Sequence, residues 1–262
     1  MFIARHLVGN SVHIASVVGD ELTDLDTDHE DLPALLAAGV NFAALATGER
    51  MPLSEAKLLA PVGAPPAILA VGLNYRAHAE EGGREVPTTP VIFTKHHNCV
   101  VGPSAGVHIP TIASEKIDYE GELAIVIGRR CRHVPRDRAA DVIAGYTIMN
   151  DWSARDIQAW EYQPLGPFLA KSFASHVSPW IVTLEALAPF RCSEYQRPKD
   201  DPSPLPYLSS ELNTATGGFD VQLEVSIASE QMREEGTAPH VLALTNMQNL
   251  YWTIFQMLTH HT

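Results

Sequence analysis

The chain has 262 residues, 45% of them hydrophobic, which is enough to bury a substantial core and excludes global disorder. Its 18 basic and 31 acidic side chains give a formal net charge of −13. This acidity argues against a nucleic-acid partner, because phosphate contacts need a basic surface. The sequence has no apolar run of the roughly 18 residues that a membrane span needs and no signal-peptide pattern. Three cysteines without CxxC spacing favour a reducing compartment, so we predict a cytoplasmic protein.

The first 60 residues are predicted to form a small unit of strands followed by a helix. The strands are predicted at residues 1–7 and 11–19, around a Gly-Asn turn, and the helix at residues 28–39. Three prolines in residues 61–69 interrupt the chain and indicate a domain boundary. We therefore predict a small N-terminal domain at residues 1–62 and a larger domain at residues 66–262.

The larger domain is predicted to be rich in strands with interspersed helices. Strand patterns occupy residues 67–75, 90–98, 119–128, 145–151 and 219–229. Helix patterns occupy residues 137–144, 153–162 and 246–262. Residues 191–218, rich in Pro, Asp and Ser, are predicted to be an ordered surface loop. This balance predicts an α+β, β-rich fold.

Three carboxylates lie at or near the ends of predicted strands. Glu120 and Glu122 are two residues apart, so both should point to the same face of one strand, and Asp151 ends another strand. Close carboxylates repel each other unless a cation or a proton lies between them, and oxygen-only sites prefer Mg²⁺, Ca²⁺ or Mn²⁺ to Zn²⁺. The alternative, a solvated strand face, is the commoner meaning of an isolated Glu-x-Glu. Against it, residues 123–128 (LAIVIG) are expected to be buried on both faces.

Further side chains are candidates for acid–base chemistry or for anion binding. His78 and Glu81 are three apart, so in a helical turn the carboxylate would raise the basicity of the imidazole; the alternative is a surface histidine in an acidic loop. Lys171, in an apolar stretch, either reaches solvent or has a buried role. Arg155 and Gln158 would share a helix face and could donate to a carboxylate or an enolate. An ordinary salt bridge of the arginine to Asp151 or Asp156 is the alternative.

Several segments together resemble the fumarylacetoacetate hydrolase superfamily. They are YEGELAIVIG, AGYTIMNDWSARDIQ and LAKSF, in this order, preceded by VGLNYRAHAEE. The resemblance covers about residues 66–262. The second half is most similar to the branch that cleaves fumarylacetoacetate in tyrosine degradation, and the VGLNYRAHAEE loop is more similar to shorter bacterial members. The resemblance implies a mixed β-sandwich roll, usually a homodimer, preceded by a small N-terminal domain.

The resemblance also implies a role for each candidate residue. The ligands of a divalent ion, Mg²⁺ with Mn²⁺ or Ca²⁺ as alternatives, would be Glu120, Glu122 and Asp151. The catalytic residues would be Lys171 near the metal and His78 with Glu81, the pair that activates water. Substrate contacts would be Arg155 and Gln158, and we assign Tyr162 to substrate binding as well.

The implied function is metal-dependent hydrolysis of a C–C bond in a small anionic β-diketo acid such as fumarylacetoacetate. Acylpyruvate hydrolysis and the decarboxylation or isomerisation of a 2-oxo acid are alternatives on the same site. Family members continue past the last helix with a turn, a Gly-Thr segment and closing strands, so we predict that the chain is truncated after Thr262. An inactive metal-binding remnant is the alternative of another class.

Overall fold

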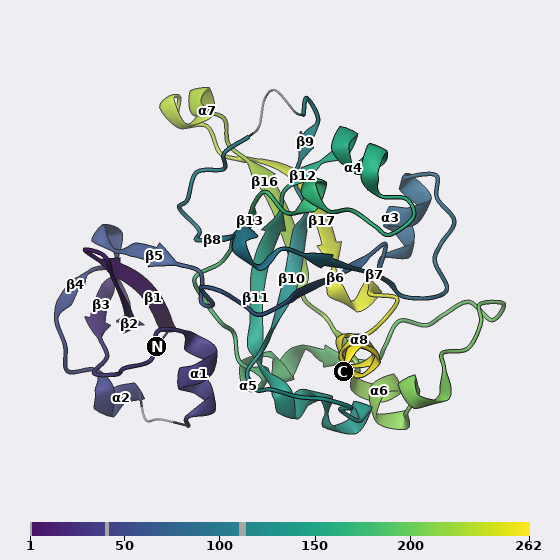
Figure 1. Cartoon of the computed structure of the whole chain (residues 1–262), viewed down its shortest axis with the longest axis horizontal. Helices are drawn as coiled ribbons and strands as arrows, with labels where there is room; N and C mark the ends of the chain where they lie inside the picture. The colour runs from purple at the N-terminus through teal and green to yellow at the C-terminus, as the bar shows by residue number, and fades with distance from the viewer. Residues whose placement is uncertain (1, 40–41, 110–113) are drawn as a thin grey trace. The chain divides into compact units, whose positions relative to one another are not determined.

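The computed structural model describes residues 2–39, 42–109 and 114–262, and the chain divides into two compact units (Figure 1). The first unit comprises residues 1–70, 92–131 and 141–186, and the second comprises residues 71–91, 132–140 and 187–262. Both units combine strands with helices, which confirms the predicted α+β, β-rich class. Because both units are discontinuous in the sequence, the boundary predicted between residues 62 and 66 stays a prediction.

A five-stranded antiparallel sheet forms the N-terminal part of the first unit, in the order β4-β3-β2-β1-β5. Its strands are β1 (Phe2–Val8), β2 (Ser11–Val18), β3 (Glu21–Asp24), β4 (Arg50–Pro52) and β5 (Lys57–Leu59). The predicted hairpin is confirmed from Phe2 onward, and Met1 lies outside the described residues. Gly9 has φ +60 at the tight turn, the left-handed conformation that glycine adopts without a steric penalty.

Both faces of this sheet carry apolar side chains, because successive residues of a strand point to opposite sides. One face packs Ala4, Ala15, Val17 and Leu22 together. On the other face Ile14 packs with Leu25, Leu32 and Leu35. The last two belong to α1 (Leu32–Ala37), which is shorter than the helix predicted at residues 28–39. The helix starts late because Asp31 is its N-cap and accepts a hydrogen bond from the backbone N–H of Ala34.

A four-stranded sheet forms the rest of the first unit and follows the order β10-β11-β13-β8. Its strands are β10 (Gly121–Ile127), β11 (Ile143–Asp151), β13 (Ser175–Val177) and β8 (Val100–Val101). β10 and β11 pair antiparallel along almost their whole length, as Figure 1 shows, which confirms the strands predicted at residues 119–128 and 145–151. The predicted burial of residues 123–128 on both faces is wrong. Only Val126 is buried and Ile127 is 40% exposed, because β10 is an outer strand with a single neighbour in this sheet.

Short elements complete the first unit and connect it to the second. β9 (Ile117–Asp118) pairs with β12 (Ser153–Ala154), which is followed by α4 (Arg155–Glu161) and the 3₁₀ helix η4 (Leu169–Lys171). The remaining elements are α2 (Phe42–Leu45), η1 (Leu53–Glu55), η2 (His97–Cys99) and α5 (Leu184–Leu187), whereas η3 (Arg136–Val142) begins in the second unit and ends in the first. The chain enters the second unit along β6 (Ile68–Gly72) and leaves it at β7 (Val91–Lys95), two strands that the sequence predicts. The helix predicted at residues 137–144 is a 3₁₀ helix that ends where β11 begins.

The second unit contains α3 (Arg76–Glu81), a two-stranded sheet and a hairpin. The sheet pairs β14 (Arg191–Cys192) with β15 (Gly218–Phe219), and the hairpin pairs β16 (Gln222–Ile227) with β17 (His240–Asn246) around α7 (Glu230–Glu234). The other elements are η5 (Ala188–Phe190), η6 (Pro206–Leu208), α6 (Glu211–Thr216), η7 (Met247–Asn249) and α8 (Ile254–His261).

Two predictions for this unit are corrected. Residues 191–218 are not only loop, because Ser210 caps α6 by accepting a hydrogen bond from the backbone N–H of Asn213. The helix predicted at residues 246–262 begins only at Ile254. There Thr253 and Gln256 form a capping box, in which each side chain accepts a hydrogen bond from the other's backbone N–H.

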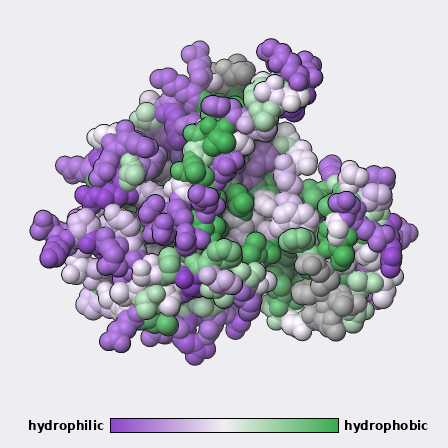
Figure 2. All heavy atoms as spheres, turned by 180° about the vertical axis from the view of Figure 1, so that it is seen from behind, coloured by the Kyte–Doolittle hydropathy of each residue, from purple (hydrophilic) through white to green (hydrophobic). Residues whose placement is uncertain are grey.

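Some large apolar side chains are exposed on the surface. Figure 2 shows hydrophobic residues (green) among hydrophilic ones on one face of the molecule. The hairpin contributes Ile227, Val241, Leu242 and Leu244, all at least 40% exposed. Among the described residues, no helix is long and apolar enough to cross a membrane.

Candidate metal centre

The three predicted carboxylates converge in the first unit. Glu120, Glu122 and Asp151 each offer an oxygen atom, and these three atoms lie within 4.8 Å of one another. Glu122 lies on β10 and Asp151 ends the neighbouring β11, so strand pairing brings them together. Glu120 precedes β10 instead of lying within it, and its carbonyl oxygen accepts a hydrogen bond from the backbone N–H of Asp151 at 2.9 Å. Asp151 is fully buried and the two glutamates are partly exposed.

Two buried lysines contact this cluster. Lys171 donates to Oε2 of Glu120, and its Nζ lies 3.6 Å from Oδ2 of Asp151. Its side chain is 2% exposed, so Lys171 is buried and the solvent-reaching alternative is wrong. Lys95, at the end of β7, donates to Oδ1 of Asp151 at 2.5 Å and to the carbonyl oxygen of Lys171. Lys95 was not predicted as a site residue, although a lysine that ends the apolar strand VIFTK was a possible signal.

Arg155 connects α4 to the same carboxylates. Its Nε donates to Oδ2 of Asp118 at 2.8 Å, and its Nη1 lies 2.7 Å from Oε1 of Glu120. Nη1 also donates to Oε1 of Gln158 at 3.0 Å, so the predicted shared helix face is confirmed. Arg155 does form salt bridges, as the alternative predicted, but the predicted partners are wrong. It pairs with Asp118 and Glu120 instead of Asp151 or Asp156. Asp118 was also missed; it comes two residues before the first predicted ligand.

Burial and mutual repulsion disfavour the charged carboxylates. Desolvation raises the pKa of Glu122 to about 8, and the negative charges of Asp151 and Glu120 add to the rise. Desolvation also raises the pKa of Asp151, against the opposing effect of Lys95 and Lys171. Oδ2 of Asp151 is buried and accepts no hydrogen bond from the described residues. A divalent cation would satisfy this oxygen and relieve the repulsion, so the oxygen-only donor set fits a hard ion.

The metal-free chain is expected to lose stability as the pH rises from about 4.5 to about 8. Folded Glu122 keeps its proton up to a pKa of about 8, whereas the unfolded chain ionises at the ordinary value of 4.5. The unfolded state therefore binds fewer protons between these limits, and a rising pH favours it, by up to about 1.4 kcal/mol per pH unit.

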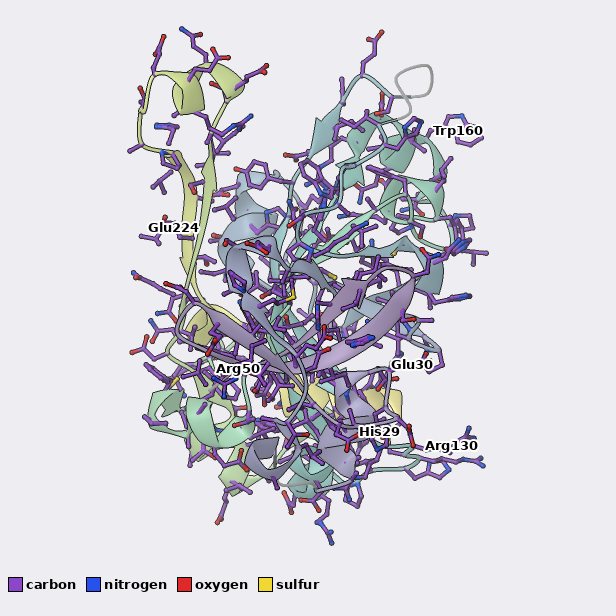
Figure 3. All side chains as sticks on the ribbon, turned by 90° about the vertical axis from the view of Figure 1, so that its left-hand side faces the viewer. His29, Glu30, Arg50, Arg130, Trp160 and Glu224 are labelled. Atoms are coloured by element: carbon purple, nitrogen blue, oxygen red, sulfur yellow. The ribbon has the colours of Figure 1, made fainter. Side chains whose placement is uncertain are left out.

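Urea unfolding at several pH values, with a chelator present, measures this slope. Glu122→Gln has no proton to lose and should give a flatter dependence than the parent chain. Glu224→Gln, at an exposed glutamate that projects from β16 (Figure 3), should keep the parent's slope. Equal slopes for Glu122→Gln and the parent would contradict the assignment.

The segment between α4 and η4 is held by one carboxylate. Oε1 of Glu161 accepts hydrogen bonds from the backbone N–H groups of Phe168 and Ala170, both at 2.8 Å. Because Lys171 follows directly, Glu161 fixes the backbone that presents this lysine. The segment exposes apolar groups. Trp160 is 87% exposed and projects away from α4 (Figure 3), and Tyr162, the predicted substrate contact, is 40% exposed.

Replacing Glu161 by Gln should loosen this segment without unfolding the chain. Loss of a charged acceptor of backbone N–H groups should raise the amide hydrogen-exchange rate of Phe168 and Ala170 roughly tenfold, because each such bond contributes about 1–2 kcal/mol. Exchange measured by NMR or mass spectrometry checks this. Glu185→Gln, at an exposed glutamate of α5, is the matched control. Unchanged protection in Glu161→Gln would show that the carboxylate does not hold the segment.

The predicted base lies in the second unit. His78 and Glu81 are both on α3, so the helical turn that their pairing required is present. Within the described chain, no hydrogen bond or ion pair joins the two side chains. Their role as a water-activating pair stays a prediction.

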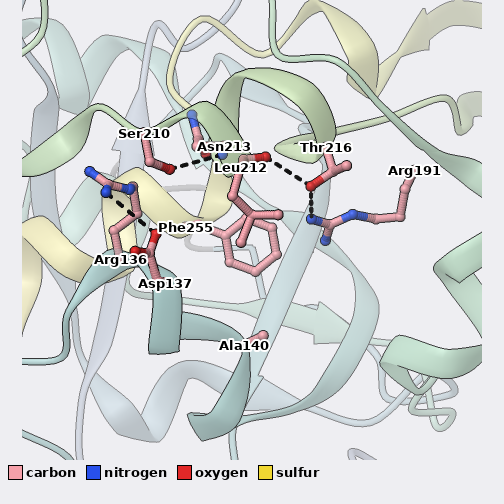
Figure 4. Close-up of a pocket in the computed structure, with 9 residues that line it drawn as sticks. All are labelled: Arg136, Asp137, Ala140, Arg191, Ser210, Leu212, Asn213, Thr216 and Phe255. Atoms are coloured by element: carbon pink, nitrogen blue, oxygen red, sulfur yellow. Dashed lines mark hydrogen bonds and ion pairs between the residues drawn. The ribbon is translucent and has the colours of Figure 1, made fainter.

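The second unit also contains a small pocket of about 60 Å³, shown in Figure 4. The guanidinium of Arg191 lies 4.5 Å from the ring centroid of Phe255 and donates to Oγ1 of Thr216. The Asp137 carboxylate is likewise paired, with Arg136 at 3.4 Å. Each of these charged groups already contacts a neighbouring side chain, so the pocket does not indicate a second reactive centre.

Taken together, the fold and the site define a β-rich α+β protein with three converging carboxylates, one of them fully buried. Residues 67–262 match the family described as "Fumarylacetoacetate (FAA) hydrolase C-terminal". The chain therefore belongs to the fumarylacetoacetate hydrolase family, as the sequence motifs predict.

Curated relatives and a solved structure agree with this membership. The chain is 51% identical over 153 residues to a fumarylacetoacetase of Arabidopsis thaliana, which covers 57% of this chain and 34% of the relative. It is 47% identical over 197 residues to a fumarylacetoacetase of Oryza sativa, and this match covers 74% of this chain and 42% of the relative. The chain thus spans less than half the length of these relatives. A 5-carboxymethyl-2-hydroxymuconate delta-isomerase from Mycobacterium smegmatis superposes with a TM-score of 0.66 at 28% identity, covering 99% of this chain and 81% of the other.

Proposed function

We propose that this chain carries the catalytic centre of a metal-dependent hydrolase that cleaves a C–C bond in a β-diketo acid such as fumarylacetoacetate. The observation that carries the proposal is the convergence of three carboxylates with two buried lysines in one centre. The names of the two plant relatives support the substrate class.

A divalent ion held by Glu120, Glu122 and Asp151 would supply Lewis acidity toward two substrate oxygens. We prefer Mg²⁺, with Mn²⁺ or Ca²⁺ as alternatives, because all three ligands are oxygen donors. The protein's own groups supply the remaining chemistry. Carbon is a poor leaving group unless its developing charge spreads onto an oxygen that meets a positive charge or a hydrogen-bond donor.

Lys171 and Arg155 are the cations placed for this task. Both already contact oxygens of Glu120, so a substrate carboxylate or enolate that approaches the centre would compete for the same donors. Gln158 holds the guanidinium of Arg155 from its own helix, which orients the charge. Tyr162 stays the proposed third substrate contact.

We propose His78, assisted by Glu81, as the general base. His78 would take a proton from water, the resulting hydroxide would attack a substrate carbonyl carbon, and the electron pair of the broken C–C bond would pass to the enolate oxygen. This assignment rests on the resemblance of the NYRAHAEE segment and on its helical conformation. His78→Gln should lower kcat and leave metal binding unchanged, and an unchanged kcat would remove His78 from the mechanism.

Isomerisation of a related unsaturated diacid is a second candidate. It is favoured by the likeness to the mycobacterial delta-isomerase at 28% identity. The same carboxylates and cations would stabilise an enolate in both reactions, but isomerisation needs no attacking water. Hydrolysis would therefore need His78 as the base that activates water, whereas isomerisation would not.

A substrate panel with Mg²⁺ or Mn²⁺ tests the proposal. It should contain fumarylacetoacetate, an acylpyruvate, fumarylpyruvate, oxaloacetate and a hydroxymuconate. We expect metal-dependent loss of fumarylacetoacetate with formation of fumarate and acetoacetate. Isomerisation without C–C cleavage would favour the second candidate, and no turnover of any substrate would favour an inactive metal-binding remnant.

We further propose a cytoplasmic homodimer that acts on small anionic substrates, with no nucleic-acid or membrane partner. The free thiols of Cys99, Cys131 and Cys192 support a reducing compartment. The exposed apolar side chains of the β16–β17 hairpin support self-association, because an interface would remove their surface from water. Sedimentation at several concentrations measures the state of assembly.

A further inference from the structure

A second cluster of potential metal ligands lies on the N-terminal sheet, away from the residues assigned to the proposed reaction. His6, His13 and Asp24 each offer one ligand atom, and these atoms lie within 4.8 Å of one another. The cluster joins three strands, since His6 is on β1, His13 on β2 and Asp24 on β3.

Strand register brings the three side chains to one face. His6 lies directly opposite His13 in the β1–β2 ladder, so both point to the same side. Asp24 lies opposite Ala15 in the β2–β3 ladder, and Ala15 is two residues from His13 and therefore on the same face. A shift of one residue in either ladder would send one ligand to the other face.

The three side chains already contact one another. Nε2 of His6 lies 2.6 Å from Oδ1 of Asp24, and Nδ1 of His13 lies 2.7 Å from Oδ2 of the same carboxylate. His6 is 1% exposed, whereas the His13 side chain is 38% exposed. The other ring nitrogen of His6, Nδ1, is buried and has no hydrogen-bond partner among the described residues. A buried imidazole with one unpaired nitrogen packs less favourably than a leucine would, so packing alone does not account for a histidine here.

Gly48 and Glu49 also fix the backbone of Asp24. Its N–H donates to the carbonyl oxygen of Glu49, and its carbonyl oxygen accepts from the N–H of Gly48. A Cβ added to Gly48 would lie 2.6 Å from Cβ of Asp24, so only glycine permits this approach. The carboxylate thus belongs to a rigid part of the sheet, which favours a preorganised ligand.

We propose that His6, His13 and Asp24 form a binding site for a divalent transition ion of the Zn²⁺ type, distinct from the carboxylate centre. Two imidazole nitrogens and one carboxylate suit Zn²⁺ and exclude Mg²⁺, which prefers oxygen ligands. Tetrahedral Zn²⁺ at about 2.0–2.1 Å from each ligand needs ligand atoms about 3.4 Å apart, so the hydrogen-bonded pairs must open by under about 1 Å. The exposure of His13 leaves an entry path and an open fourth position for water or an exogenous ligand.

Zn²⁺ competition against a chromophoric chelator, with excess Mg²⁺ present to occupy the carboxylate centre, tests the site. The metal-stripped chain is expected to bind one Zn²⁺ that Mg²⁺ does not displace. His13→Ala and Asp24→Asn should weaken this binding by about a hundredfold, because each removes a ligand. With Co²⁺ as the probe, the visible absorption of a tetrahedral ion should appear in the parent chain and be lost in both variants.

Two controls locate the ion. His240→Ala removes an exposed histidine of β17 and should leave Zn²⁺ affinity unchanged, as should Glu122→Gln. If Zn²⁺ binding is lost in Glu122→Gln and kept in His13→Ala, the ion belongs to the carboxylate centre and the proposal fails. If the parent chain binds no Zn²⁺, the three residues are only a hydrogen-bonded group, which also overturns it. His13 is partly exposed, so His13→Ala should fold even if Asp24→Asn does not, and circular dichroism checks this.

Discussion

Asp151→Asn is expected to lower the kcat/KM of the proposed metal-dependent cleavage by about three orders of magnitude. Asp151 is the fully buried member of the carboxylate centre, and its Oδ2 accepts no hydrogen bond from the residues that the structure describes. An asparagine has nearly the same shape but no charge, so the centre would keep two carboxylates against Lys95, Lys171 and Arg155. The excess positive charge would repel a divalent cation, and Mg²⁺ affinity should fall together with activity.

Steady-state assays over a range of Mg²⁺ concentrations separate the two effects. If the fall reflects weaker metal binding alone, high Mg²⁺ should restore part of the rate. Asp20→Asn, at an exposed aspartate in the turn between β2 and β3, is the matched control and should behave as the parent. Full activity of Asp151→Asn at the parent's Mg²⁺ requirement would remove this residue from the centre.

Lys95→Met is expected to destabilise the metal-free chain by about 3–5 kcal/mol, because it leaves the buried charge of Asp151 less compensated. Both side chains of this ion pair are 0% exposed, and Nζ lies 2.5 Å from Oδ1. The variant also loses the donor to the carbonyl oxygen of Lys171, which holds the end of η4. Methionine has a similar length and an apolar tip, so the packing change is small.

Mg²⁺ distinguishes the electrostatic cause from a packing defect. A divalent ion would replace the missing positive charge, so saturating Mg²⁺ should restore more stability to Lys95→Met than it adds to the parent. Denaturant unfolding with Mg²⁺ or with chelator measures both differences. Lys57→Met, at an exposed lysine of β5, should be near neutral. If Mg²⁺ does not reduce the loss of stability in Lys95→Met, the lysine has a packing role.

These two expectations share one physical origin. Lysine ammonium groups contact carboxylate oxygens that would also be ligands of a cation. A bound ion would therefore release Lys171 and Arg155 from part of their pairing with Glu120 and free them for an anionic substrate. Metal binding and substrate binding are expected to be cooperative for this reason.

The sequence by itself determined many of the local elements and predicted most of the residues that converge in the carboxylate centre. Two apolar segments around a Gly-Asn turn predicted the hairpin of β1 and β2, and apolar runs predicted the strands β10 and β11. The spacing of Glu120 and Glu122 predicted only a same-face pair, with Asp151 at another strand end, and the resemblance of the surrounding motifs made them a predicted ligand set. Element ends were less well predicted, because caps such as Thr253 decide where a helix begins.

Only the tertiary structure decided which other side chains these residues contact. Lys95 lies 56 residues before Asp151 in the sequence, and no local pattern predicts that their side chains pair. Arg155 has acidic neighbours on its own helix, yet strand pairing brings Asp118 and Glu120 to it instead. The cluster of His6, His13 and Asp24 likewise depends on the register of two ladders. Sequence periodicity fixes which face a side chain occupies, whereas the contacts between faces arise from long-range packing, and those contacts set the charge and the burial of the centre.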